Sequence, residues 1–426
     1  IPGDIKELCK SVEVYIFTDQ DVQLKLPESF APFMDYMSFG VLPQHLFDGM
    51  DIEEIASSPL NLAPVGSGPY QFSELLMEGD AISGVKLQAF PDYVGDKPFL
   101  TEIIFRFYPD AITAYQAFQA GYVQGISEVP ADLMDEALVN EDLNIYTGRL
   151  PRISLLLLNL NDQGVPYFQE QEVRRALLMG IDRQGMINQL FNGQAIQANG
   201  VILPGTWAYN DGIAEVFYDP QGAAQLLKNA GYVISSEAEQ VRKKEDVSLS
   251  FVLSYPDDDL HQSIATMIAD DWSNIGVRVD LEAVPPDAFT KEKLDTRSFQ
   301  AALVDLNLSN SPDPDPSPFW DLGQAESGQN YSQWNNRLAS DSIEQARVTA
   351  DRLERTRLYH NFQAIFAEEL PALPLYYPVY NYGVSNQIQG VTMGPLFDAS
   401  DRLTTVNKWY ITTSRDPQAV ETEPGQ

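Results

Sequence analysis

A strand–helix–strand run between residues 247 and 282 constrains the fold more than any other feature of the sequence. Residues 247–254 alternate apolar and polar side chains, and residues 277–282 do the same. Between them, residues 258–275 have the spacing of a long amphipathic helix, which ends at Gly276. Since a crossover between parallel strands is almost always right-handed, the two strands are predicted to be parallel neighbours. The sequence therefore predicts an α/β protein.

Strands and helices alternate along most of the remaining chain. The expected elements are paired strands at 12–17 and 21–26, a helix from about Phe30, a strand at 102–108, a helix from Asp110 to Gly121, a strand from Ile153 to Leu160, helices at 169–179, 182–193 and 221–230, a charged helix over 341–368 with one interruption, and extended chain at 371–378. The strand from Ile153 is almost continuously apolar, which indicates burial on both faces. The polar tail, residues 414–426, is expected to be disordered.

Composition narrows the class of protein. A chain of 426 residues with 44% apolar side chains is long enough for two or three cores, so at least two lobes are expected. The formal charge of −34 repels phosphate backbones and anionic lipids, which argues against nucleic acid as a partner. The longest apolar run, from Ile153 to Leu160, is far shorter than the roughly 20 residues that span a bilayer. No segment is therefore predicted to cross a membrane.

Neither a disulfide nor a bound cofactor or metal is expected. Cys9 is the only cysteine, which excludes an internal disulfide. The histidines are too widely spaced for a zinc site; they are His45, His261 and His360. The glycine-rich run from Pro64 to Phe72 lacks the Gly-Lys-Ser/Thr ending of a phosphate loop.

An enzymatic function is not expected either. The sequence has no Gly-x-Ser-x-Gly elbow to present an activated serine, and His261 and His360 fall on predicted helices with exposed character. An acidic chain supplies carboxylate pairs everywhere, so they do not single out a glycosidase site. We predict no catalysis.

A proline-rich, acidic and aromatic segment precedes the charged helix. Residues 311–320 read Ser-Pro-Asp-Pro-Asp-Pro-Ser-Pro-Phe-Trp, and residues 328–334 read Gly-Gln-Asn-Tyr-Ser-Gln-Trp. Because repeated prolines lower the entropy lost on ordering, the segment is expected to present four side chains for binding: Asp313, Asp315, Phe319 and Trp320. A rigid surface loop is the alternative. A calcium site that adds Asp321 is disfavoured, since the glycine and closing glutamate of calcium loops are absent.

Several motifs occur in an order that resembles one family. They are Pro64-Val-Gly-Ser-Gly-Pro-Tyr-Gln-Phe72, Ala117-Phe-Gln-Ala-Gly121, Glu172-Val-Arg-Arg-Ala-Leu177 with Gly180-Ile-Asp182, Ala224-Gln-Leu-Leu-Lys-Asn-Ala-Gly-Tyr232, Asp271-Trp-Ser-Asn-Ile-Gly-Val277 and Leu370-Pro-Ala-Leu-Pro374. Together they resemble the extracytoplasmic solute-binding proteins of peptide-type ABC transporters, which include oligopeptide, dipeptide and nickel binders. Each match is weak alone, but their order over residues 60–410 is specific.

The resemblance implies a periplasmic-binding-protein-like fold of class II type, with two α/β lobes, hinge strands and a ligand enclosed between the lobes. It assigns residues 1–155 and 376–413 to lobe I and residues 156–375 to lobe II. Compared with the family, the N-terminal part of lobe I and a lipoprotein signal are expected upstream, so the protein is expected to be extracytoplasmic and lipid-anchored. The implied function is that of a monomeric binding component of an ABC importer, which delivers a small solute, first of all an oligopeptide, to a membrane permease.

The resemblance also indicates where ligand contacts lie, and the sequence departs from the family there. The family's aspartate for a peptide amino group falls on Asn310 or Pro312, and the dipeptide binders' arginine for a carboxylate falls on Tyr255. A salt-bridged clamp on both peptide ends is therefore not expected. The remaining ligand candidates combine aromatic walls with polar groups: Trp207, Tyr209, Tyr255, Asn310, Asp313, Asp315, Trp320, Asn330, Tyr331 and Trp334. Oligosaccharides and other solutes stay open as ligands, as does ligand sensing without transport.

Overall fold

The computed structural model describes residues 10–37, 40–235, 240–309 and 312–412. The chain divides into two compact units. Unit 1 comprises residues 1–39 and 151–378, and unit 2 comprises residues 40–150 and 379–426. The predicted tail, residues 414–426, lies outside the described residues.

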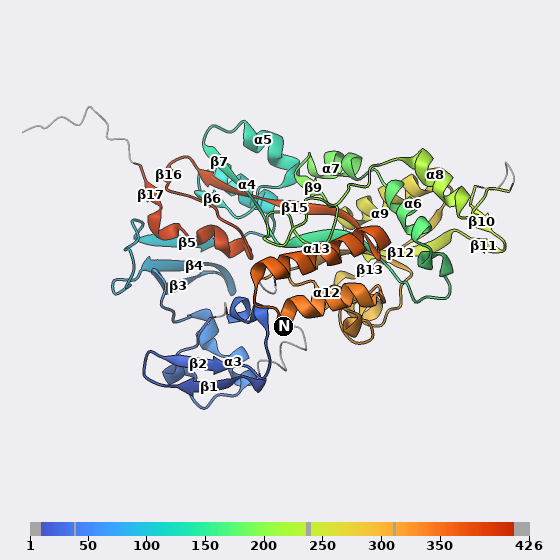
Figure 1. Ribbon diagram of the computed structural model, residues 1–426. Helices are drawn as coiled ribbons and strands as arrows, with labels where there is room; N and C mark the ends of the chain where they lie inside the picture. The colour runs from blue at the N-terminus through green and yellow to red at the C-terminus, as the bar shows by residue number, and fades with distance from the viewer. Residues whose placement is uncertain (1–9, 38–39, 236–239, 310–311, 413–426) are drawn as a thin grey trace, which may run out of the picture. The chain divides into compact units, whose positions relative to one another are not determined.

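Unit 1 contains most of the helices drawn in Figure 1. Its elements are β1 (Glu13–Ile16), β2 (Val22–Lys25), η1 (Ala31–Met37), β8 (Arg152–Leu158), η4 (Pro166–Gln169), α6 (Gln171–Met179), α7 (Arg183–Phe191), β9 (Ala195–Gln197), α8 (Pro220–Asn229), β10 (Lys243–Lys244), β11 (Val247–Ser248), β12 (Ser250–Pro256), α9 (Asp259–Asn274), β13 (Arg278–Val284), α10 (Pro286–Phe289), η5 (Thr290–Leu294), β14 (Ala301–Asn307), α11 (Ser317–Trp320), η6 (Leu322–Gln324), α12 (Arg337–Val348), α13 (Arg352–Glu369) and the first part of β15 (Ala372–Ser385).

One sheet forms the centre of unit 1. Its strands lie in the order β13, β12, β14, β8 and β15. β12 pairs in parallel with both β13 and β14, whereas β8 pairs antiparallel with β14 and β15. The parallel neighbours predicted between residues 247 and 282 are therefore confirmed, and α9 is the helix that connects them.

Helices of unit 1 bury their apolar faces in the core that this sheet forms. Every residue of β8 after Arg152 is buried, as its continuous apolar run predicted. Trp272 of α9 is fully buried, and its Nε1 donates a 2.8 Å hydrogen bond to the carbonyl of Leu177 in α6. The indole also contacts the ring of Phe251 on β12, with the ring centroids 5.3 Å apart. These contacts fix α9, and with it the polar residues at its first turn, against the sheet.

The charged helix predicted over 341–368 consists of two helices, α12 and α13, which lie side by side (Figure 1). Thr349 at the end of α12 has an extended backbone, and the Asp351 side chain accepts a hydrogen bond from the Glu354 amide at the start of α13. Such a cap favours a new helix start, so the predicted interruption is confirmed. The helix predicted from Phe30 is the 3₁₀ helix η1.

Unit 2 combines short helices with three groups of strands. Its elements are α2 (Gln44–Phe47), α3 (Ile52–Ala56), η2 (Pro59–Leu62), β3 (Tyr70–Glu78), β4 (Ala81–Ala89), β5 (Glu102–Arg106), α4 (Ala111–Gln119), β6 (Gly125–Ile126), η3 (Ala131–Leu133), α5 (Met134–Leu138), β7 (Leu143–Arg149), the second part of β15, β16 (Ile388–Gln389), η7 (Ala399–Leu403), η8 (Val406–Lys408) and β17 (Tyr410–Ile411). β3, β4 and β5 form an antiparallel sheet in that order. β6 and β7 pair with the part of β15 that follows Pro378.

Residues 1–39 group with unit 1, whereas the resemblance assigns them to lobe I. The hydroxyl of Ser29 donates a 2.9 Å hydrogen bond to the Val348 carbonyl at the end of α12, and η1 packs on the same helix. The other unit boundaries, at residues 150–151 and 378–379, lie close to the predicted crossings. The assignment of the lobes stays a prediction.

Candidate functional site

The predicted ligand candidates gather in unit 1, in and around a segment that we call the acidic loop, residues 312–334. Asn310 lies outside the described residues. Trp207 and Tyr209 precede α8, and Tyr255 lies near the end of β12. The other candidates belong to the acidic loop itself, where the structure shows what each side chain contacts.

Asp313 is anchored inside unit 1 by Arg355 of α13. Its carboxylate accepts a 2.7 Å charge-assisted hydrogen bond from Arg355, and only 5% of the residue is exposed. The same guanidinium donates to the carbonyl of Ala346, at 3.0 Å. Burial raises the pKa of the Asp313 carboxyl, and the charge and hydrogen bond of Arg355 offset only part of the rise. Asp313 thereby holds the acidic loop on the two helices that follow it.

Asp315 makes a second attachment of the loop. Its carboxylate lies 3.0 Å from Nε of Arg347 on α12, and its other oxygen accepts a 3.0 Å hydrogen bond from the Ser317 amide. The side chain of Asp315 is 2% exposed. No group of three or more His, Cys, Asp or Glu residues suited to a metal ion occurs in the described part of the chain, which includes Asp313, Asp315 and Asp321.

Trp207 lies against two cationic side chains of α13. The guanidinium carbons of Arg352 and Arg355 lie 5.0 and 4.9 Å from the centre of a Trp207 ring, within the range of a cation–π interaction. The indole also contacts Tyr359, with centroids 5.7 Å apart. Tyr209 is partly buried against the core, and its carbonyl lies 3.2 Å from Nε2 of His360. Both aromatic candidates thus have contacts within unit 1.

The aromatic residues of the acidic loop are buried as well. Asn330 is fully buried, and its amide nitrogen donates to the carbonyls of Asp321 and Trp334 at 3.1 and 2.9 Å. The Trp334 Nε1 donates a 2.7 Å hydrogen bond to Glu369. Further ring contacts join Trp320 to Phe366 at 4.8 Å and Tyr331 to the guanidinium of Arg297 at 5.0 Å. These contacts account for the positions of the four side chains within the fold, while their role in ligand binding stays a prediction.

A different group of polar residues lies where β12 and β14 end, and we call it the edge cluster: Asp258, His261 and Asp305. Asp258 caps α9, and its carboxylate lies 2.7 Å from Nδ1 of His261. Nε2 of His261 lies 3.4 Å from the carboxylate of Asp305 on β14. The imidazole is only 12% exposed, whereas the two carboxylates are 43% and 47% exposed. The expected exposure of His261 was therefore wrong, because the first turn of α9 lies against the strand ends.

The two carboxylates of the edge cluster favour the protonated form of His261. Burial works against a charged imidazole, but the hydrogen bonds and charges of Asp305 and Asp258 outweigh it, so the pKa of His261 is raised. Across the sheet, Asp305 lies opposite Ser154, which lies opposite Tyr376. Directly paired residues point to the same face of a sheet, so this row extends the cluster across three strands.

The sequence contained a signal for this cluster that our predictions did not use. Asp258 and His261 have the spacing of a helix cap and its third residue, directly after a predicted strand. Side chains at the carboxyl ends of neighbouring parallel strands meet at one edge of a sheet, which is where α/β proteins bind ligands. The partner from β14 was not identifiable in this way, since its pairing with β12 spans about fifty residues of sequence.

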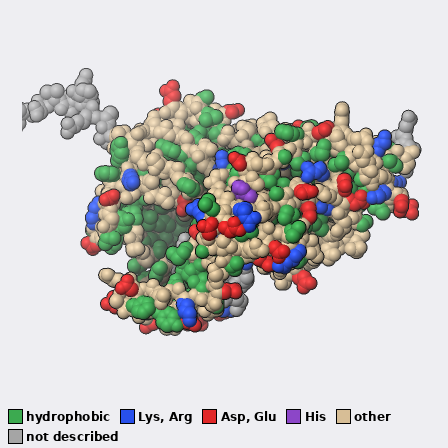
Figure 2. All heavy atoms as spheres, in the orientation of Figure 1, with side chains coloured by type: hydrophobic (Ala, Val, Ile, Leu, Met, Phe, Trp, Pro, Cys, Tyr) green, Lys and Arg blue, Asp and Glu red, His purple; other side chains and the backbone are tan. Residues whose placement is uncertain are grey.

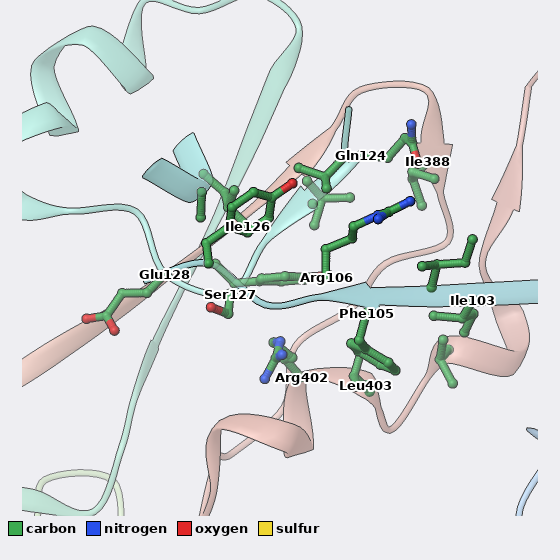
Figure 3. Close-up of a pocket in the computed structure, with 18 of the residues that line it drawn as sticks. Ile103, Phe105, Arg106, Gln124, Ile126, Ser127, Glu128, Ile388, Arg402 and Leu403 are labelled. Carbon is green, nitrogen blue, oxygen red and sulfur yellow. The ribbon is translucent and has the colours of Figure 1, made fainter. Parts of the chain in front are cut away.

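Unit 2 contains a cavity of about 760 Å³. It is lined along the whole of β5 and its continuation, residues 102–108, and along residues 122–128 around β6. In Figure 3, Arg106 points toward Gln124 and Ile388, and Glu128 points away. The cavity has a volume typical of binding sites for small molecules.

The described helices include none that is long and apolar enough to span a membrane. Figure 2 shows acidic side chains scattered over the visible face among fewer basic ones, in keeping with the net charge of −34. Two compact units, with an α/β sheet in unit 1 and polar side chains at the carboxyl ends of its parallel strands, form an architecture suited to ligand binding.

Comparison with known proteins identifies the family. The model for bacterial extracellular solute-binding proteins, family 5 Middle, matches residues 10–329, and the chain belongs to this family. The dipeptide-binding protein of Escherichia coli (strain K12) is 27% identical over 391 residues, which are 90% of this chain and 69% of the relative. The oligopeptide-binding protein AppA of Bacillus subtilis (strain 168) is 26% identical over 415 residues, 96% of this chain and 74% of the relative.

Solved structures agree with this fold. The ABC transporter substrate-binding protein CtaP from Listeria monocytogenes has a TM-score of 0.79 at 26% identity, over 94% of this chain and 78% of that chain. The Bacillus subtilis protein AppA in complex with a nonapeptide has a TM-score of 0.72 at 24% identity, over 96% of this chain and 79% of that chain. The predicted family and fold class are thereby confirmed.

Proposed function

We propose that the protein is the substrate-binding component of an ABC importer and that it captures a peptide for transport. Membership of the family of extracellular solute-binding proteins carries this proposal, since the match covers residues 10–329. Relatives named for dipeptides and oligopeptides support a peptide as the ligand. The predicted absence of catalysis is part of the proposal.

The ligand site that we propose lies at the strand ends of unit 1, next to Tyr255 and the edge cluster. Ligands of open α/β sheets bind outside the carboxyl ends of the strands, and β12 and β14 end there. The half-exposed carboxylates of Asp258 and Asp305 suit a peptide amino group. Trp207 and Tyr209 are proposed as aromatic walls of this ligand site.

The acidic loop has a supporting role in this proposal. Asp313 and Asp315 are bound to arginines of α13 and α12, so they hold the loop in one conformation. The remaining candidates of the loop are proposed as a rigid frame or as ligand contacts, depending on the ligand: Trp320, Asn330, Tyr331 and Trp334. Asn310 precedes the loop, and it is proposed as a ligand contact only. A prearranged loop lowers the entropy that binding costs.

Other solutes are the second candidate class of ligand. Solved structures with a similar fold include one in complex with Ni(L-His) and one with agropinic acid, at 22% and 24% identity. Oligosaccharides and ligand sensing without transport also stay as alternatives. The proposal further includes a membrane permease as partner and a monomeric state of the protein. It also includes a lipid anchor on the outer face of the membrane.

The test is a search for ligands with the 426-residue chain. Native mass spectra and thermal melts are recorded with pooled peptides and, separately, with pooled oligosaccharides. A ligand at a hundred times its Kd is expected to stabilise the folded state by about 2.7 kcal/mol. A mass adduct with a raised melting temperature from the peptide pool alone supports the proposal. The same response from the oligosaccharide pool alone would overturn the peptide assignment.

A further inference from the structure

The edge cluster of unit 1 holds one imidazole between two carboxylates. Nδ1 of His261 lies 2.7 Å from the carboxylate of Asp258, and Nε2 lies 3.4 Å from that of Asp305 on β14. The acids that flank the cap, Asp257 and Asp259, are exposed. Both ring nitrogens of His261 therefore face an acceptor, and only the protonated imidazole has an N–H for each of them.

A neutral imidazole satisfies only one of the two carboxylates. Its single proton is expected on Nδ1, because the contact with Asp258 is the shorter one. Nε2 then directs a lone pair toward Asp305, so two acceptors face each other. The Asp305 side chain is 47% exposed, which makes it accessible to a cation from outside the protein. A primary ammonium group has three N–H donors and suits both Asp305 and the Nε2 beside it.

The strands next to the cluster add polar groups that do not titrate near neutral pH. Ser154 on β8 lies opposite Asp305, and Tyr376 on β15 lies opposite Ser154. Burial raises the pKa of Tyr376, so its hydroxyl keeps its proton in this range. Arg152 stands two residues before Ser154, which places it on the same face of the sheet, and it is exposed. The proton that is exchanged near neutral pH therefore belongs to His261.

We propose that His261 is a specificity-determining residue of the ligand site, where as a cation it competes with the amino group of a peptide for Asp305. This inference rests on the peptide function proposed above. A protonated imidazole repels an arriving ammonium group and occupies its acceptor. Once the imidazole has lost its proton, two negative charges remain and Nε2 becomes an acceptor. Preference for a free amino group over a blocked one therefore rises with pH.

The probes are the tripeptide Ala-Phe-Ala and its N-acetylated form, titrated into the full 426-residue chain by calorimetry at pH 5.5 and pH 8.5. Each Kd is divided by that of His261→Gln at the same pH, so titration of the peptide itself cancels. For the free peptide this ratio is expected to fall about fivefold as the pH rises, and for the acetylated peptide it is expected to stay within about twofold. His45→Gln, at an exposed histidine of unit 2, is the control and is expected to keep the pH dependence of the unaltered chain.

A second measurement uses the unaltered chain alone and does not depend on how the variant folds. Since binding and protonation are linked, Ala-Phe-Ala is expected to release a fraction of a proton at pH 7, seen as different apparent enthalpies in phosphate and Tris buffers. The acetylated peptide is expected to release none.

The outcomes separate this inference from the proposed function. Binding of Ala-Phe-Ala with a constant ratio and no proton release would overturn the role of His261 and leave the peptide site standing. An equal change for both peptides would overturn competition with the amino group. Failure of both peptides to bind at either pH would overturn the proposed peptide site, and the role of His261 with it.

Discussion

Asp313 in the acidic loop and Asp305 in the edge cluster belong to the same unit but lie in opposite environments. The side chain of Asp313 is 1% exposed and is paired with a buried arginine, whereas that of Asp305 is 47% exposed beside His261. A buried carboxylate needs a permanent cation, because an unpaired charge is too costly inside a protein. A half-exposed carboxylate is free to exchange water for a ligand. The comparison separates acids that hold the fold from acids suited to binding.

The largest effect is expected when the buried ion pair of Asp313 and Arg355 is broken. Arg355→Met is expected to lower the free energy of unfolding by about 3–5 kcal/mol, because it leaves Asp313 buried without its cation. Chemical denaturation monitored by tryptophan fluorescence measures this loss. Arg357→Met is the control, since Arg357 and its partner Glu354 are both exposed, and little change is expected. Similar losses from both variants would contradict the structural role of Asp313.

The second prediction concerns the frame of the acidic loop. Trp334→Phe removes the hydrogen bond from Nε1 to Glu369 while keeping an aromatic ring, and it is expected to cost about 1.5–3 kcal/mol. Trp409→Phe in unit 2 is the matched control, because Nε1 of Trp409 donates to the neutral hydroxyl of Thr405. Loss of this hydrogen bond is expected to cost about 1 kcal/mol. A larger loss at Trp409 would argue against the charged contact as the stronger one.

The third prediction tests the binding side of the comparison and depends on the proposed function. Asp305→Asn is expected to weaken binding of peptides with a free amino group about tenfold, with no change for N-acetylated peptides. Isothermal titration calorimetry with each peptide pair measures the difference. Asp280→Asn, an exposed carboxylate on β13, is the control and is expected to bind normally. An equal loss for free and acetylated peptides would exclude recognition of the amino group by Asp305.

The smallest expected effect is the pH dependence of the edge cluster. Since the folded-state pKa of His261 is raised, its protonated form stabilises the fold fully below the unfolded pKa of about 6.5, and this contribution is lost as the pH rises through the folded pKa. At pH 5.5 the free energy of unfolding of the unaltered chain is expected to be higher than that of His261→Gln, by less than about 1 kcal/mol. At pH 8 this difference is expected to be smaller. Denaturation curves at both values measure this difference. An advantage that grows with pH would reverse the assigned sign.

Most of the fold was predictable because local signals agreed with the tertiary packing. The strands around α9 follow the alternation of residues 247–254 and 277–282, and the cap at Asp258 marks the helix start. The interruption between α12 and α13 follows the cap at Asp351. The site was less predictable, since proline and aspartate in the acidic loop signal a rigid loop equally well whether its carboxylates face a ligand or an internal arginine.

The sequence by itself determined the α/β class, the order of most strands and helices, and the motifs of the family, because these depend on periodicity and on caps within a few residues. Only the tertiary structure decided which acids have partners. Arg355 reaches Asp313 across 42 positions of the chain, and Asp305 meets His261 at the ends of two different strands. Such pairings are set by how helices and strands pack, and burial then fixes which charges stay neutralised and which remain available for binding.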